Sequence, residues 1–151
     1  MLGVPIVFDT SIALNLLATN VSLSVLQSVE MDCFVCSSVV AETLYIRCDD
    51  PTQPREAVSI DPWLQSGRVK IASLDSPLEE ELYVQSAADL DDGEAMSLAI
   101  CRARGYALAT DDRKARRIAS QLVSVTGRDL SLDILTLLSG WFLNIPSGLA
   151  C

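Results

Sequence analysis

The stretch from Gly93 to Arg117, GEAMSLAICRARGYALATDDRKARR, decides the fold. Its first half is typical of a helix over 92–104 that ends at Gly105, since glycine is common just after a helix. The apolar run 106–110 then predicts a strand, and the charged run 112–121 predicts a second helix. Strands that alternate with helices in this way are typical of a parallel sheet.

The rest of the chain continues the same alternation. A short apolar run ends at Phe8 and is followed by a helical stretch that begins near Thr10. Three prolines between Asp49 and Gly67 predict a connection or a short broken helix in that segment. Further strands are expected at 33–36, 69–73 and 123–126, and further helices at 21–29, from a cap at 37–38 to about 47, at 77–88 and at 131–139.

The strands are apolar throughout instead of alternating, which indicates a parallel sheet covered by helices on both faces. Half of the 151 residues are hydrophobic but only 5% are aromatic, so aliphatic side chains must fill the core. The length fits one domain of about 150 residues. We therefore expect a single α/β domain over residues 1–151, a three-layer α/β/α sandwich with a mostly parallel, roughly five-stranded sheet.

Charge and composition exclude several classes of function. The chain has no histidine, which excludes Ser-His-Asp and Cys-His catalysis and the common histidine-containing zinc sites. Its net charge of -9 argues against a protein that coats nucleic acid or an anionic membrane by bulk charge. Any chemistry must therefore use carboxylates or metals, and any contact with nucleic acid must be local.

Five cysteines and the absence of a signal-like N-terminus indicate a reducing cytoplasm. Cys33 and Cys36 could form half of a zinc site or a redox pair, but they lie in an apolar run that reads as a buried strand. The sequence also lacks a continuous apolar run of about 18 residues, so we expect no membrane-spanning helix.

Acidic residues lie where the predicted strands end and the helices begin. Asp9 follows the first strand, and Asp111 and Asp112 follow the strand at 106–110. Glu42 and Glu94 lie in the first turns of helices. Because ligands of parallel sheets bind beyond the carboxyl ends of the strands, these carboxylates should converge. Together they would repel one another unless a hard cation such as Mg²⁺ or Mn²⁺ neutralised them.

Each acid also has a structural interpretation. Asp9 can cap the following helix, and Asp91 with Glu94 matches a capping box. The aspartates at 111 and 112 can cap or favour the positive end of the next helix. Glu42 is harder to explain in this way, because apolar residues surround it and no serine or threonine stands three residues before it.

Positive charge is concentrated in one segment. Six of the 11 lysine and arginine residues fall within 102–117. Arg113, Arg116 and Arg117 share one face of the predicted helix, next to the aspartate pair. They could hold phosphates there, with Arg113 and Arg116 as the first candidates, or they could form an ordinary solvated helix face.

These motifs resemble the PIN-domain nucleases, a family that includes the VapC-like toxins of bacterial and archaeal toxin–antitoxin systems. The resemblance runs from Val7 to about Leu138 and is most specific between Gly93 and Arg117. That part looks like the subgroup in which a Gly-Glu-Ala helix start precedes a strand ending in an aspartate pair. The matching elements are Phe8-Asp9-Thr10-Ser11, Glu42, Gly93-Glu94-Ala95 and Ala109-Thr110-Asp111-Asp112-Arg113.

The resemblance implies a metal-dependent endoribonuclease that leaves a 5′-phosphate and a 3′-hydroxyl. Asp9, Glu42, Glu94 and Asp112 would be catalytic and bind one or two Mg²⁺ or Mn²⁺ ions, with Asp111 as a further ligand or support and Ser11 in support. Many family members have aspartate where this chain has Glu94, whose longer side chain would shift a second metal position. The resemblance also implies an antitoxin as a possible protein partner.

Two other functions fit the sequence less well. A haloacid-dehalogenase-like or receiver-like phosphotransfer domain also uses a strand-end aspartate with magnesium. The dehalogenase-like domain needs a second aspartate two residues after Asp9, where this chain has Ser11. The receiver-like domain needs a lysine at the end of a later strand, and Lys70 and Lys114 are poorly placed for that role. A catalytically inactive PIN-like interaction module is the third interpretation. It would bind no ion.

The mean hydropathy of +0.33 is high, which favours an apolar surface that a partner covers. We therefore expect either a homodimer or an antitoxin complex. The segment from Trp141 to Cys151 is a candidate contact.

Overall fold

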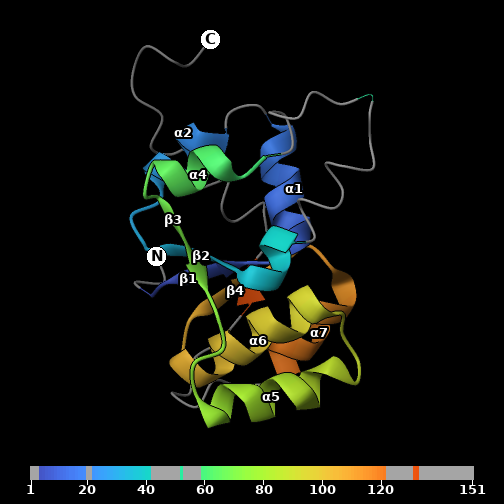
Figure 1. Ribbon diagram of the computed structural model, residues 1–151. Helices are drawn as coiled ribbons and strands as arrows, with labels where there is room; N and C mark the ends of the chain where they lie inside the picture. Colours follow the sequence, from blue (N-terminus) through green and yellow to red (C-terminus); the bar gives the residue numbers. More distant parts are fainter. Residues whose placement is uncertain (1–3, 20–21, 42–51, 53–58, 122–130, 133–151) are drawn as a thin grey trace.

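Five strands form one parallel sheet in the described part of the computed structural model, in the order β3-β2-β1-β4-β5 (Figure 1). The structure describes residues 4–19, 22–41, 52, 59–121 and 131–132. Each pair of neighbouring strands runs parallel, which confirms the expected parallel sheet. The strands are β1 (Ile6–Phe8), β2 (Cys33–Cys36), β3 (Val69–Ala72), β4 (Ala107–Ala109) and β5 (Ser131–Leu132).

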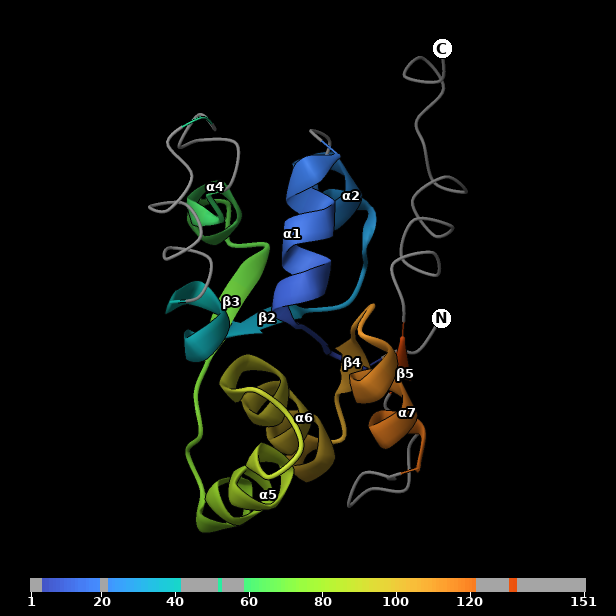
Figure 2. The same cartoon turned by 90° about the vertical axis from the view of Figure 1, so that its right-hand side faces the viewer.

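Helices cover both faces of this sheet, which gives the three layers predicted from the sequence. The helices α1, α2 and α4 lie on one side, and α5, α6 and α7 lie on the other (Figures 1 and 2). Residues 37–41 are also helical. The element bounds are α1 (Thr10–Ala18), α2 (Ser22–Ser28), α4 (Asp61–Gln65), α5 (Pro77–Ala87), α6 (Asp92–Arg104) and α7 (Arg113–Gln121).

Burial explains why the central strands are apolar throughout. Every residue of β1 and β4 is buried, because helices cover both faces of the sheet there. The edge strand β3 differs, since its two middle residues, Lys70 and Ile71, are exposed. The core is accordingly aliphatic around the sheet centre, with Phe8 and Trp63 as its largest buried rings.

Polar residues fix where the helices begin and end. The Asp9 carboxylate accepts the N–H of Ile12 and caps α1, and Ser76 caps α5 in the same way. Gly105 ends α6 in the left-handed region, with φ of 72°, which favours glycine. These local signals explain why the predicted helix over 92–104 is confirmed at both ends.

One predicted element is wrong, and others lie outside the described residues. Ser131 and Leu132 do not begin a helix; they form β5, which pairs with Leu108 and Ala109. Backbone hydrogen bonding to β4 outweighs the local helical pattern at these two positions. The strand expected at 123–126 and the remainder of the helix expected at 131–139 lie outside the described residues. Within the proline-rich segment, Pro62 stands in the first turn of the short helix α4.

Cys33 and Cys36 are buried in β2, as the packing interpretation predicted. Burial raises the pKa of the Cys33 thiol to about 11, so this thiol stays protonated at neutral pH. A protonated, buried thiol suits packing better than metal binding or redox chemistry. None of the helices that the structure describes is long and apolar enough to cross a membrane.

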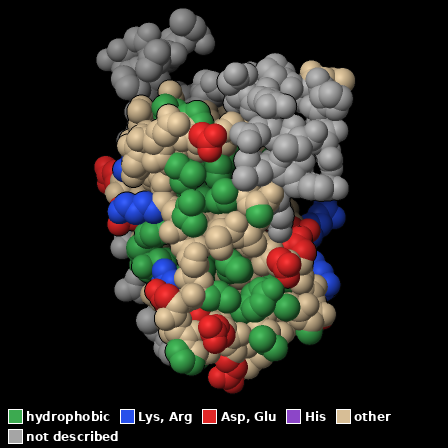
Figure 3. Space-filling model, in the orientation of Figure 1, with side chains coloured by type: hydrophobic (Ala, Val, Ile, Leu, Met, Phe, Trp, Pro, Cys, Tyr) green, Lys and Arg blue, Asp and Glu red, His purple; other side chains and the backbone are tan. Residues whose placement is uncertain are grey.

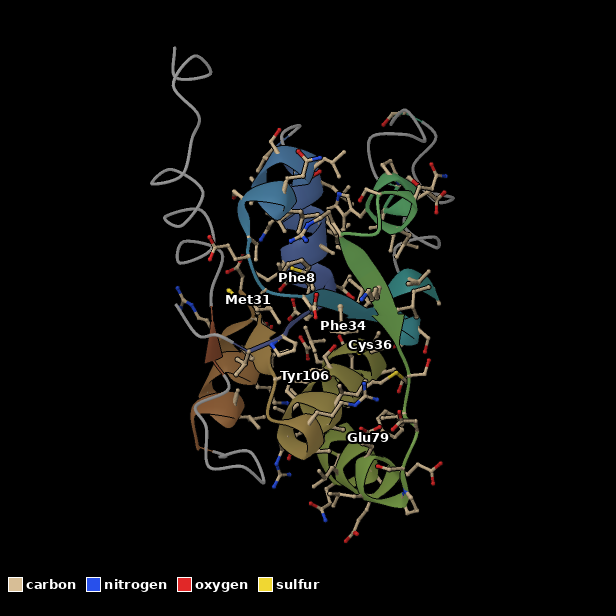
Figure 4. All side chains as sticks on the ribbon, turned by 90° about the vertical axis from the view of Figure 1, so that its left-hand side faces the viewer. Phe8, Met31, Phe34, Cys36, Glu79 and Tyr106 are labelled. Atoms are coloured by element: carbon tan, nitrogen blue, oxygen red, sulfur yellow. The ribbon has the colours of Figure 1, made fainter. Side chains whose placement is uncertain are left out.

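A polar cluster attaches the end of α6 to the start of α5. Arg104 Nε lies 2.6 Å from Glu79 Oε1, and Arg104 Nη2 donates to the carbonyl oxygen of Ser73. The guanidinium also lies over the ring of Tyr106, which stacks on Phe34 (Figure 4). Glu79 is only 2% exposed, so its carboxylate depends on this cation.

The environment of Glu79 keeps its carboxyl ionised. Burial works to raise the pKa of Glu79, but the hydrogen bonds and charge of Arg104 and the backbone N–H of Asp75 outweigh it. The pKa of Glu79 therefore lies below its ordinary value, and the ionised carboxyl contributes stability above that value.

Replacing Arg104 by Ala should lower the free energy of unfolding by about 3 kcal/mol at neutral pH, because a buried carboxylate loses its cation. The loss should shrink as the pH falls through the lowered pKa of Glu79, since a protonated carboxyl needs no cation. Urea unfolding at neutral pH and near pH 3 measures both effects. Glu80→Ala, an exposed change next to Glu79 on α5, should stay within about 0.5 kcal/mol of the parent protein. A loss for Arg104→Ala that did not vary with pH would contradict this account.

Candidate active site

The candidate site lies where the sheet order reverses, between β1 and β4. From β1 the chain adds β2 and β3 on one side and returns to place β4 and β5 on the other. Ligands of such sheets bind beyond the carboxyl ends of the strands at this point. Phe8 and Ala109 are paired at the ends of β1 and β4. Asp9 and Thr110, the residues that follow these two strands, therefore lie at the same edge of the sheet. The sequence predicts that the acids after β1 and β4 face one crevice, and this requires the two strands to be neighbours, as they are.

Asp9 is nearly inaccessible to solvent, with 1% of its surface exposed. Its Oδ1 accepts hydrogen bonds from the Ser11 hydroxyl at 2.7 Å and from the Ile12 N–H at 3.0 Å. Burial raises the pKa of Asp9, and the charge of Asp111 raises it further, against hydrogen bonds from Thr110, Ile12 and Ser11 that lower it. The structural interpretation of Asp9 as a helix cap is therefore correct, and the same carboxyl is also buried beside other acids.

Ser11 connects the two strand ends. Its hydroxyl donates to Asp9, and its oxygen accepts the backbone N–H of Asp111 at 3.2 Å. Asn15, one turn further along α1, donates its side-chain amide to Asp111 Oδ2 at 2.7 Å. Figure 2 shows the start of α1 beside the connection between β4 and α7. Ser11 therefore contacts two of the predicted site residues, Asp9 and Asp111.

Asp112 caps α7. Its Oδ1 accepts the N–H of Ala115 at 2.8 Å, and its own N–H donates to the Thr110 hydroxyl at 3.1 Å. The cap engages one carboxylate oxygen, and no described residue donates a hydrogen bond to the other, Oδ2. A carboxylate can therefore fix the helix start and still offer an oxygen to a ligand.

Glu94 lies in the first turn of α6 and forms the capping box with Asp91. The Glu94 N–H donates to Asp91 Oδ1 at 2.9 Å, and the Glu94 carboxylate accepts the backbone N–H of Asp91. Its pKa is nevertheless raised to about 7, by burial first and then by the charges of Asp91, Asp112 and Asp9. The fold thus brings Glu94 close enough to the strand-end acids for mutual repulsion.

Two predicted site residues are not described. Glu42 lies outside the described residues, although the helix that precedes it, residues 37–41, is described. Ser37 and Ser38 of that helix each donate a hydroxyl hydrogen bond to Met96 Sδ at 3.6 Å, which places the helix start beside α6. The backbone of Arg116 belongs to α7, but its side chain is not described.

The basic segment divides into two parts with different environments. Arg104 is engaged with Glu79 and Asp75, so it belongs to the structural cluster between α5 and α6. Arg113, Lys114 and Arg117 are exposed on α7, which begins directly after Asp112. Among the described side chains of this segment, those on α7 follow the strand-end acids directly in the chain.

The donors at this site are carboxylate and hydroxyl oxygens, the ligands that Mg²⁺ and Mn²⁺ prefer. The mutual repulsion of Asp9, Glu94 and Asp112 is also what a bound cation would relieve. Among the residues that the structure describes, no group of three or more acidic or thiol side chains is placed so that it could hold a metal ion. The described acids have the oxygen atoms that a hard cation prefers. Glu42, the remaining predicted ligand, lies outside the described residues.

Sequence reasoning missed two polar contributors, Asn15 and Thr110. Asn15 is an exposed polar residue in a helix whose other faces carry Ile12, Ala13, Leu16 and Leu17 in the core. Thr110 is fully buried, yet it hydrogen bonds to both strand-end acids, Asp9 and Asp112. The sequence offers one signal for each residue. Asn15 stands one helical turn after Ser11, and Thr110 stands directly after β4.

Comparisons with known proteins agree with this fold. The family model of the PIN domain matches residues 5–135 of the chain. The fold is similar to that of PAE2754 from Pyrobaculum aerophilum, with a TM-score of 0.61 and 17% identity over 93% of this chain and 97% of that one. It is also similar to a chain in the structure of VapBC2 from Rickettsia felis bound to a DNA fragment from their promoter. That match has a TM-score of 0.59 and 15% identity over 85% of this chain and 98% of the other. A search of curated proteins found no match.

Replacing Glu94 by Gln should stabilise the metal-free protein at pH 8 by about 1–2 kcal/mol after allowance for solvent screening. A carboxyl whose pKa is raised in the folded state lowers stability as the pH rises from its ordinary range to about 7. Glutamine keeps the capping box, so the helix start is preserved. Urea unfolding of the metal-free proteins near pH 4 and pH 8 tests this, because the two proteins should differ only at the higher pH. Glu81→Gln, an exposed change on α5, is the control. A Glu94→Gln protein no more stable than its parent at pH 8 would show that Glu94 is not repelled by its neighbours.

Proposed function

This chain belongs to the PIN-domain family, and from that premise we propose that it is a divalent-metal-dependent endoribonuclease that hydrolyses RNA phosphodiester bonds. PIN domains are generally nucleases, and they typically use divalent metal ions. The observation that carries the proposal is the position of Asp9 directly after β1 and of Asp112 three residues after the end of β4, where the sheet order reverses. RNA as the substrate is the part of the proposal that needs direct measurement.

Asp9, Glu94 and Asp112 would hold the Mg²⁺ or Mn²⁺, with Glu42 as a fourth ligand and Asp111 beside them. Asp9 and Asp112 each use Oδ1 to cap a helix, and these hydrogen bonds to the backbone restrict the rotation of both side chains. Ser11 orients Asp9 by donating to it. These contacts hold two acids in place before any ligand arrives, which lowers the cost of assembling the site.

A bound divalent cation supplies Lewis-acid chemistry for phosphodiester hydrolysis, which suits a chain without histidine. The chain's own acids set the charge of the site. Glu94, with a pKa of about 7, can hold or release a proton near neutral pH when the site is metal-free. A cation nearby would favour its ionised form. Cation binding and proton release are therefore expected to be linked at this residue.

Substrate phosphates would lie against the start of α7. Arg113 and Lys114 are exposed in its first turn, immediately after the strand-end acids, and Arg116 and Arg117 follow on the same helix. The chain as a whole carries a charge of -9, so its other surfaces would repel a polyanion. This distribution supports a local contact through Arg113 and Arg116, with Lys114 as an added candidate.

We also propose that this protein binds a protein partner. The neighbour from Rickettsia felis is a VapBC2 structure, which supports the proposal that this chain pairs with an antitoxin or with a second copy of itself. Apolar side chains are visible between acidic ones on the face that carries β3 and α5 (Figure 3). Ile71 of β3 and Leu78 and Val84 of α5 are exposed by 50%, 43% and 68%.

Replacing Asp9 by Asn should reduce RNA cleavage by more than about 100-fold, because a ligand of the proposed cation is lost. Asparagine is an equally good helix cap, so the fold should remain. Cleavage of a mixed structured and single-stranded RNA pool is measured with Mn²⁺, with Mg²⁺ and with chelator.

The matched control is Asp32→Asn, an exposed aspartate that immediately precedes β2 at its amino end. This control should cleave as well as the parent. Undiminished metal-dependent cleavage by Asp9→Asn would exclude the assigned site. No cleavage by the parent together with no Mn²⁺ binding in calorimetry would favour an interaction module without chemistry.

Replacing both Arg113 and Lys114 by Ala should raise KM for single-stranded RNA about tenfold with little change in kcat, because these residues would bind substrate and not the reacting atoms. The slope of log affinity against log salt should fall by about 0.7 for each lost phosphate contact. Binding to catalytically inactive Asp9→Asn protein over a salt series measures the slope. Lys70→Ala removes an exposed cation from the edge strand β3 and should leave the slope unchanged. An unchanged slope in the double variant would place the substrate elsewhere.

A further inference from the structure

Two residues on one face of α1 contact Asp111, in the connection after β4. Ser11 and Asn15 are four residues apart on α1, so their side chains lie on the same side of the helix. The Ser11 oxygen accepts the backbone N–H of Asp111 at 3.2 Å. The Asn15 amide donates to Asp111 Oδ2 at 2.7 Å. These two contacts fix both the backbone and the carboxylate of Asp111.

The contacts lie between the two strand-end acids. Asp9 is the residue immediately before α1, and Asp112 is the residue immediately after Asp111. A shift of Asp111 relative to α1 therefore changes the position of Asp112 relative to Asp9. The described hydrogen bond of the Asn15 side chain goes to Asp111.

We propose that Asn15 is a positioning residue of the active site, which holds Asp111 against α1 and so sets the spacing of Asp9 and Asp112 at which a divalent cation binds. This inference rests on the proposed cation site. It assigns Asp111 the role of a connector between Asn15 and Asp112. Outer residues that orient metal ligands commonly change metal affinity or activity by about 10–100-fold when they are replaced.

Stability gives no reason for an asparagine at this position. Asn15 is exposed, and asparagine is less favourable than alanine in a helix interior. An exposed hydrogen bond between side chains largely replaces hydrogen bonds to water. Removing the side chain should therefore leave the melting temperature nearly unchanged, which separates a positioning role from a structural one.

The test compares Asn15→Ala, Asp111→Ala and the double variant with the parent protein. We expect Asn15→Ala to weaken Mn²⁺ binding in calorimetry about tenfold and to lower kcat about 10–100-fold, with KM and the melting temperature of the metal-free protein unchanged. Because Asn15 acts through Asp111, the double variant should bind Mn²⁺ no more weakly than Asp111→Ala. Gln27→Ala, an exposed amide removed from α2, is the matched control and should change nothing.

Three outcomes would overturn the proposal. Parent-like Mn²⁺ affinity and kcat in Asn15→Ala would show that the contact does not position the site. Additive losses in the double variant would show that Asn15 does not act through Asp111. A fall in melting temperature large enough to explain the lost activity would show a structural role.

The Mn²⁺ measurement separates this proposal from the proposed function. If the parent binds Mn²⁺ but cleaves no RNA, ribonuclease activity is excluded, while weaker Mn²⁺ binding by Asn15→Ala still supports the positioning role. If the parent binds no Mn²⁺, both are overturned.

Discussion

The parallel pairing of β1 with β4 at the centre of the sheet is the constraint on which the candidate site depends. Each strand has only three residues, all buried, and each ends one residue before a polar segment. Pairing Phe8 with Ala109 therefore brings two segments that are about 100 residues apart in the chain to the same edge. The hydrophobic core stabilises this pairing, so the energy that brings the acids together comes from aliphatic burial and not from the acids themselves.

Helix capping and ligand binding do not compete at this edge. A carboxylate has two oxygens, and the caps of α1 and α7 engage Oδ1 of Asp9 and of Asp112. The sequence presents the structural and the functional interpretation as alternatives, but the structure allows both for the same residue. The cap gives each acid a fixed orientation, and burial followed by the charges of the neighbouring acids raises the pKa of Glu94.

Positive charge close in sequence serves two separate purposes. Arg104, at the end of α6, compensates buried Glu79 and ties α5 to α6, which supports the helix that carries Glu94. Arg113, Lys114 and Arg117 of α7 are exposed instead, and this helix begins directly after Asp112. Counting charges along the chain cannot separate these roles, because a buried partner such as Glu79 is identified only by the packing of α5 on α6.

The sequence by itself determined the three-layer architecture, the bounds of α6 and the positions of Asp9, Glu94 and Asp112 at the starts of helices, since periodicity, caps and strand ends are local signals. Tertiary structure alone decided that Ser131 and Leu132 pair with β4, that Arg104 neutralises Glu79, and that Asn15 reaches Asp111 across 96 positions of sequence. These contacts join distant segments, and their energies depend on neighbours that no local window contains. The order of strands in the sheet settles which of the polar residues can meet.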